Sequence, residues 1–262
     1  MPPTCLVHMI LVALAAPGVP RAGDDPSLAL SAPTVASEEP RWRFDAFIYY
    51  WSASLDGELT VDGDDVDLDG GGDGGFSGDP ALTGFLGHFE ASRGPWSFAV
   101  APIFVNVSTT GDEEAGAVAD IEIHAQIHEA FAAHEIGGAW QWLAGARYYD
   151  LETDVSLTQG GVPVGALGSN RTWVDPIVGV RYHQDLGEHW SLRGRADVGG
   201  FGVGSELSWN ASALVGYGFT SSFAAHFGYR ALYVDFEQDS GSDRVEYDLT
   251  MYGPILGISF SF

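Results

Sequence analysis

The chain has 262 residues, enough for one large domain with a sizeable core. It carries 36 acidic residues against 11 arginines and no lysine, and its formal net charge is -25. This balance excludes a nucleic-acid-binding protein, which needs a basic surface to neutralise phosphates. The single cysteine, Cys5, excludes a disulfide scaffold and a cysteine-based metal site. No run of about 18 or more apolar residues follows residue 30, so a helical membrane protein is excluded as well.

The first 40 residues have the composition of an export signal followed by a spacer. Residues 5–16 form an apolar run of signal-peptide length, with cleavage expected after Gly18 or Ala22. Residues 1–4 contain no basic residue, which is atypical of such a signal. Residues 24–40 are rich in Pro, Ser and Ala and predict a disordered spacer. We therefore divide the chain into a signal peptide (1–22), a spacer (23–40) and one domain (41–262).

From Arg41 onward, polar and apolar residues alternate, which is typical of β-strands with two different faces. In residues 120–128, Asp, Glu, His and Gln at even positions oppose Ile and Ala at odd positions, and only Glu129 breaks the pattern. Ten such segments predict about ten strands, with eight or twelve as alternatives. They cover residues 41–58, 78–92, 95–109, 118–133, 138–154, 172–186, 189–203, 205–219, 222–236 and 246–262.

The connections between these segments alternate between short turns and long or acidic loops. Long loops are expected at residues 57–77, 111–117, 154–171 and 237–245, and the short link at residues 202–205 falls on the same side. This arrangement predicts an all-β fold, an up-and-down antiparallel transmembrane β-barrel. A soluble lipocalin-like barrel has the same alternation, with its apolar face inward.

Aromatic residues near the strand ends favour the membrane barrel, since such barrels carry aromatic girdles at both interfaces. The expected girdle residues lie on the apolar face and are Trp142, Tyr148, Trp173, Tyr182, Trp190, Trp209, Tyr217, Tyr229 and Tyr233.

The last strand ends in Phe262, and the apolar residues Phe260, Ile258 and Leu256 alternate back from it. This pattern resembles the C-terminal assembly signal of bacterial outer-membrane proteins, and residues 41–262 resemble the small OmpA-type barrels without their peptidoglycan-binding domain. The resemblance implies a monomer in the outer membrane of a Gram-negative bacterium. Its partners would be outer-membrane lipid, lipopolysaccharide and the barrel-insertion machinery, which would read Phe262, Phe260 and Ile258.

The polar face is expected to line the lumen, where side chains of both signs would pair because buried charges need partners. We expect them to form a structural plug, with a narrow, gated pore as the alternative. Acidic outer loops would make such a pore prefer cations. The predicted network consists of Glu122, His124, His128, Arg147, Asp175, Arg181, Arg193, Arg195, Asp197 and Arg230.

The first long loop contains Asp65-Val-Asp67-Leu-Asp69-Gly70, which matches the start of a calcium-binding loop. The twelfth position is Phe76, where such loops have a bidentate Glu. Asp65, Asp67, Asp69 and Asp73 are therefore candidates for weak Ca²⁺ binding, and a solvated loop is the alternative. No other cofactor is expected.

Two further functions remain as alternatives to a non-enzymatic barrel. One is an outer-membrane enzyme acting on lipid A or peptides. His189-Trp190-Ser191 is similar to the His-x-Ser of lipid A deacylase barrels, and Asp150, Asp154 and Asp235 are acids of the kind that omptin-type proteolysis needs. The other is a soluble lipocalin-like periplasmic carrier. We assign no catalytic residue, and we exclude a zinc pair at His124 and His128, which would lie about 13 Å apart along one strand.

Overall fold

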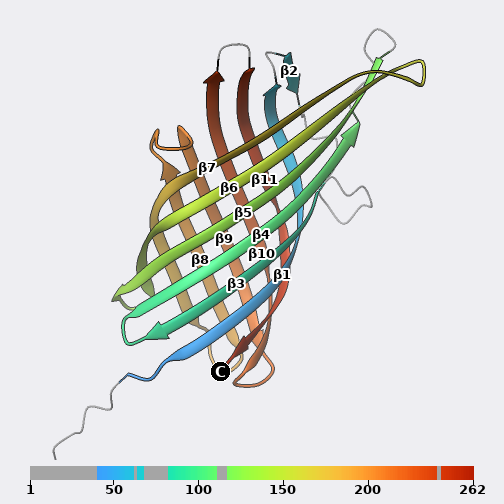
Figure 1. The fold of residues 1–262 in the computed structure, drawn as a ribbon. Coiled ribbons are helices and arrows are strands. Elements are labelled where there is room, and N and C mark those ends of the chain that lie inside the picture. Colours follow the sequence, from blue (N-terminus) through green and yellow to red (C-terminus); the bar gives the residue numbers. More distant parts are fainter. Residues whose placement is uncertain (1–39, 62–63, 68–81, 111–116, 241–242) are drawn as a thin grey trace, which may run out of the picture. The chain divides into compact units, whose positions relative to one another are not determined.

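The computed structural model describes residues 40–61, 64–67, 82–110, 117–240 and 243–262, and these form an antiparallel β-barrel (Figure 1). The barrel belongs to a compact unit at Pro40–Phe262, whereas the expected signal peptide and nearly all of the spacer lie outside the described residues. The strands are β1 (Arg43–Val61), β2 (Asp64–Asp67), β3 (Leu82–Arg93), β4 (Trp96–Thr110), β5 (Ala117–Gly137), β6 (Trp140–Gln159), β7 (Val162–Asp185), β8 (Trp190–Gly200), β9 (Leu207–Gly218), β10 (Phe223–Ser240) and β11 (Asp243–Ser261).

Ten of these strands form a closed barrel, as the alternation predicts. β3 pairs with β1, and each later strand pairs with the one before it in sequence. β2 pairs with the end of β1, and β11 pairs with β1 to close the sheet. At the closing seam, the backbone N–H groups of Phe44 and Phe262 each donate to the other residue's carbonyl oxygen at 2.9 Å. Closure removes the sheet edge at the seam. β7 pairs with β8 only at Ile177–Asp185, so its residues 162–176 pair with β6 alone. None of the described residues forms a helix long and apolar enough to cross a membrane.

Two of the expected long loops are largely strand, so those predictions are wrong. β6 and β7 continue toward each other through residues 154–171 and are joined by Gly160 and Gly161. Both glycines have a positive φ, +58° and +80°, which a two-residue hairpin turn of this hand requires. β10 likewise continues to Ser240, and β11 begins at Asp243. The wall formed by β5, β6 and β7 is therefore taller than the wall formed by β8 and β9, as Figure 1 shows.

The lower part of the outer wall, toward the short turns, is a belt of exposed apolar side chains. Phe227 is 55% exposed and Leu256 60% exposed, although both lie in well-paired strands. Aromatic contacts follow both edges of the belt: Trp190 packs on Tyr217 below, and Trp209 stacks on Tyr233 above. Trp209 and Tyr217 are eight residues apart, or about 26 Å along a tilted strand. With a strand tilt of about 35–45°, this is about 20 Å of height, close to the apolar band of about 25 Å in outer-membrane barrels, which indicates a lipid-facing surface.

Above this belt the polarity of the wall is reversed. In β5, Ile123 and Ile127 point into the barrel and are buried, whereas Glu122, His124 and Gln126 are exposed on the outside. The prediction that the polar face lines the lumen is therefore wrong for this part of the strand. Water surrounds the wall at this height, so the hydrophobic effect directs the apolar side chains inward.

Trp173 is likewise not a girdle residue. It is buried inside the barrel, where it stacks between Tyr149 at 4.7 Å and Phe236 at 3.9 Å between ring centroids. The interior thus has an apolar upper level and, below it, the charged residues of the site described next.

Replacing Val178 with Arg tests where the lipid-facing belt lies. Val178 is exposed on β7, midway between Val174 and Tyr182, so a charge there is expected to cost about 2–4 kcal/mol of unfolding free energy in a bilayer. Thr172→Arg is the matched control, because Thr172 is exposed on the same face of β7 but lies above the belt. Urea unfolding of both variants in lipid vesicles measures the difference, and equal losses would contradict the position of the belt.

Candidate functional site

Two carboxylates and three arginines form a buried ion network in the middle of the barrel. Arg147 donates from Nε to Glu129 at 2.8 Å and from Nη2 to Asp197 at 2.6 Å. Arg195 bonds the same two acids at 2.6 and 2.7 Å, and Arg230 approaches Glu129 at 3.4 Å. Glu129 and Arg147 are essentially inaccessible to solvent, so neither charge would be stable without its partners. The network links β5, β6, β8 and β10 across the lumen.

A second ion pair lies below the first and involves Glu90 of β3. Both carboxylate oxygens of Glu90 accept hydrogen bonds from Nη2 of Arg181, at 3.0 and 2.8 Å. His88 lies 3.0 Å from the same carboxylate. These contacts connect β3 with β7 through the interior of the barrel.

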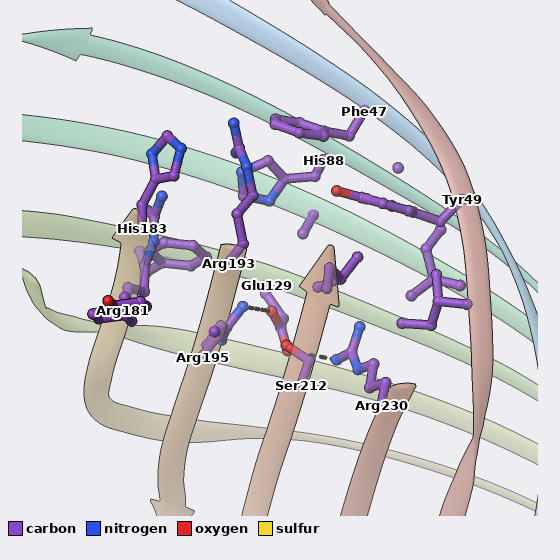
Figure 2. Close-up of a pocket in the computed structure, with 18 residues that line it drawn as sticks. Phe47, Tyr49, His88, Glu129, Arg181, His183, Arg193, Arg195, Ser212 and Arg230 are labelled. Carbon is purple, nitrogen blue, oxygen red and sulfur yellow. Dashed lines mark hydrogen bonds and ion pairs between the residues drawn. The ribbon is translucent and has the colours of Figure 1, made fainter. Parts of the chain in front are cut away.

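Arg193 differs from the other interior arginines because it has no carboxylate partner among the described residues. Its guanidinium lies 4.8 Å from the ring centroid of Phe47, a cation–π contact. Figure 2 shows Arg193 extending between His183 and Phe47 into a cavity that Arg181, Arg195 and Arg230 also line. The lower interior is therefore rich in arginine.

Asp175 is fully buried, but its partners are neutral donors. It accepts hydrogen bonds from the backbone N–H of Ser205 at 2.7 Å and from the Ser208 hydroxyl at 2.8 Å. Trp173 donates to the hydroxyl of Ser205 at 2.8 Å. These bonds hold the short turn between β8 and β9 against β7. Asp175 thus anchors this turn, which is the lowest part of the upper rim of the barrel.

The upper interior is filled by apolar side chains. Twenty buried hydrophobic residues from both sides of the barrel form one cluster, which includes Trp51, Ile103, Ile127, Tyr247 and Met251. The void among them measures about 10 Å³. This is about the 10–15 Å³ that a single water needs, so the packing here is close. Buried polar atoms lie in the same part of the interior, among them the hydroxyls of Tyr149, Thr153 and Tyr247.

Seven of the ten predicted network residues point into the barrel, and three do not. Glu122 and His124 are exposed on the outer wall, where the Nδ1 atom of His124 lies 2.8 Å from the side-chain oxygen of Asn106. His128 stacks on Tyr148 at the upper edge of the belt, with 6.1 Å between ring centroids and 5° between the planes. The prediction that these three residues line the lumen is wrong, because the faces of β5 are reversed at this height.

The sequence analysis missed Glu129 and Glu90 as network members. Glu129 interrupts the apolar face of β5, and that irregularity was the available signal: a lone acid among buried Ile and Phe requires arginine partners. Glu90 lies between the exposed Phe89 and the half-buried Ala91 and carries no comparable signal.

The acids at the upper rim lie on the outer wall. Asp150 and Asp154 are on the outer side of β6, and Asp235 of β10 faces Asp248 directly across the β10–β11 pair. Partial burial, together with the negative charges of Asp248 and Glu206, raises the pKa of Asp235 above its ordinary value. Like charges directly opposite each other destabilise a sheet, so ionised Asp235 is unfavourable for folding.

The other candidate sites give no assembled centre. Asp65 and Asp67 belong to the short strand β2, and Asp69 and Asp73 lie outside the described residues. Within the part of the chain that the structure describes, no group of three potential metal ligands occurs. In the His-x-Ser segment, Nδ1 of His189 contacts the carbonyl oxygen of Gly218 at 3.1 Å, and Ser191 lines the lower mouth of the barrel.

Comparison with known proteins shows a likeness of fold. The sequence matches no protein-family model and no curated protein. The structure is similar to the outer-membrane protease OmpT from Escherichia coli, with a TM-score of 0.56 and 10% identity over 84% of this chain and 97% of that chain. Ail of Yersinia pestis (TM-score 0.34) and neisserial surface protein A (0.30) have 12% and 13% identity; each match covers 84% of this chain and 98% or 97% of the other. The fold is therefore that of an outer-membrane β-barrel.

Replacing Glu129 with Gln tests the central network. The change leaves Arg147 and Arg195 with one buried counter-charge fewer, and breaking a buried pair typically costs about 3–5 kcal/mol. Glu122→Gln is the control on the same strand, and we expect little change from it because Glu122 is exposed outside. Unfolding in vesicles distinguishes the two, and a Glu129→Gln barrel as stable as the original would contradict the network's role.

Asp235→Asn is expected to stabilise the barrel in a pH-dependent way. A carboxyl with a raised pKa in the folded state binds its proton more tightly when folded, so its unfavourable effect appears as the pH rises above the ordinary pKa. The variant should be more stable than the original protein near neutral pH, and the difference should vanish in acid. Urea unfolding across this pH range measures it. A difference that does not depend on pH would rule out this cause.

Proposed function

We propose that this protein is a closed, structural barrel of the outer membrane of a Gram-negative bacterium, with the tall β5–β7 wall displayed above the lipid. The apolar core in the upper half of the barrel carries this proposal. The lipid-facing belt supports the membrane location, and the likeness to outer-membrane barrels supports the kind of membrane. The short turns would then face the periplasm, as in barrels of this class.

The filling of the lumen supports a closed barrel over a pore. An ion crossing the barrel would have to enter a region whose void is about 10 Å³ and whose lining is apolar except for Tyr149. Removing water from an ion in such a region is very unfavourable. A cation that passed it would next meet the arginines of the lower interior. The narrow, cation-preferring pore is therefore the less favoured alternative.

The placement of the rim acids does not favour a hydrolase. Among the described residues, no histidine bonds to Asp150, Asp154 or Asp235, and all three lie on the outer wall. The barrel interior at that height is mainly apolar, with Thr153, Ser169 and Arg171 also on its inward face. We therefore propose a non-enzymatic role.

The closing seam supports the proposed partners and the monomeric state. Because β11 pairs with β1, the closing seam offers no free edge through which a second copy could pair. Above it, residues 162–176 of β7 pair with β6 but not with the shorter β8. Ile258, Phe260 and Phe262 all point outward at the lower end of β11. We propose that outer-membrane lipid and lipopolysaccharide surround the belt and that the barrel-insertion machinery recognises these three residues.

Conductance measurements test the closed state. Reconstituted protein is expected to give no steady current in a planar bilayer. Replacing Ile127, Leu151 and Met251 together with Ser should introduce water into the core and allow a measurable current, because all three line its void. The control changes Gln126, Glu152 and Thr250 to Ser, which are outward neighbours on the same strands. A large, steady current through the unmodified protein would contradict the proposal.

Phe262→Asp tests the assembly signal. The substitution keeps the two backbone hydrogen bonds with Phe44 but removes the outward ring, which is 69% exposed. Assembly in cells is expected to fall, as measured by heat-modifiable gel mobility of outer-membrane fractions, whereas refolding of the purified chain into detergent should succeed. Normal amounts of the folded variant in the outer membrane would contradict recognition of Phe262.

A further inference from the structure

The lower interior contains a cavity of about 130 Å³ with an unusual lining. Four arginines surround it: Arg181 from β7, Arg193 and Arg195 from β8, and Arg230 from β10. Figure 2 shows these side chains converging from one side, with Phe47, Tyr49 and His88 on the other. Glu129 is the one carboxylate in its lining, and its contacts with Arg147, Arg195 and Arg230 belong to the central network.

Each of the four arginines has a buried nitrogen without a hydrogen-bond partner among the described residues. These donors are Nη1 of Arg181, Nε of Arg193, Nη2 of Arg195 and Nε of Arg230. Arg230 is only 8% exposed, so bulk water does not reach it freely. A buried donor without an acceptor is costly, and four around one cavity indicate that an acceptor belongs there.

The charges around the cavity do not balance. Glu129 and Asp197 neutralise two of the three arginines of the central network, and Glu90 neutralises Arg181. Arg193 has neither an ion pair nor a hydrogen bond among the described residues, and Phe47 holds its guanidinium in position. This section of the barrel therefore has an excess of positive charge that is not matched by its own carboxylates.

The cavity is reached from the short-turn end of the barrel. A second hollow of about 300 Å³ opens at that mouth, and His183 and Arg193 line both spaces. At the other end, the apolar core closes the lumen. A ligand would thus enter through a mouth lined by both Arg193 and the carboxylates Asp45, Asp185 and Glu188, and it could not continue through the barrel.

From this lining we propose that the cavity binds a small oxyanion, such as phosphate or sulfate. Its volume of about 130 Å³ has room for a compact tetrahedral anion together with bound water. Arginine presents planar paired donors that fit phosphate oxygens, and charge-assisted hydrogen bonds to them are strong. If the orientation proposed above holds, the anion comes from the periplasm.

Titration of the purified, refolded barrel with inorganic phosphate tests this site, using calorimetry and the urea unfolding midpoint at constant ionic strength. We expect saturable binding and a midpoint that rises with phosphate, since a ligand of the folded state stabilises it. Arg193→Met should weaken binding by about tenfold or more, the effect of losing one charge-assisted interaction. Neither measurement depends on membrane orientation or conductance, so this result is independent of the proposed function.

The control is Arg171→Met, which removes one arginine from β7 away from the cavity and should leave phosphate binding unchanged. Arg193→Lys keeps the charge but loses the paired donors, so intermediate affinity is expected even if Arg193→Met fails to fold.

Glycerol 3-phosphate binding more tightly than inorganic phosphate would assign an organic phosphate as the ligand, and weaker binding would assign a free oxyanion. No saturable phosphate binding by the unmodified protein would overturn the proposal. Equal losses in Arg193→Met and Arg171→Met would overturn it too.

Discussion

The structure depends on one constraint: the same closed wall faces lipid at one height and water at another, while its interior must be filled at both. In β6, Trp142 and Tyr148 point outward within the belt, and Asp150 and Glu152 follow them on the same face above it. The strand does not change its pleat, so only the chemistry of the outward residues changes. The inward residues need not follow the outer wall, and they change from charged below to apolar above. Within the belt the outward face is apolar and the inward face carries the charges. Above the belt the outward face is polar and the inward face is mainly apolar.

The two interior fillings have different physical roles. The apolar core gains stability simply from burial, and its void of about 10 Å³ shows close packing. A buried ion network gains little net energy, because desolvation of the charges offsets their attraction. Its geometry is specific, however: Glu129 on β5 meets Arg147 on β6 and Arg195 on β8 only in one register. In a barrel whose strands could slide by two residues and keep their alternation, such contacts fix the alignment.

Much of this could be predicted from the sequence, and the failures have one main cause. Alternation and turn spacing gave the ten strands and the closed topology, and the outward positions of Trp190, Trp209 and Tyr217 follow from it. The prediction assigned one face of each strand to lipid along its whole length, because periodicity cannot say where the lipid ends. It therefore placed Glu122 and His128 in the lumen and Trp173 outside. The signal was Glu129, a single acid on an inward face of β5 that is otherwise apolar. The Gly160–Gly161 turn was also visible, as the pattern of a tight hairpin within an expected loop.

Negative and positive charges lie in different parts of the barrel: acids on the outer wall above the belt, and arginines in the lower interior. The acids of the upper wall, Asp150, Glu152 and Asp235 among them, lie outside, and so they cannot neutralise the arginines within. In the proposed closed barrel, a cation drawn to the upper rim would meet a closely packed, mainly apolar core and then the arginines below it, two barriers in series. An anion that enters from the lower mouth passes Asp45, Asp185 and Glu188 as well as Arg43 and Arg193, reaches the arginine-lined cavity, and then stops at the same core. In the closed barrel that we propose, the core closes one end only, and the arginine-lined lower interior would hold an anion without conducting it.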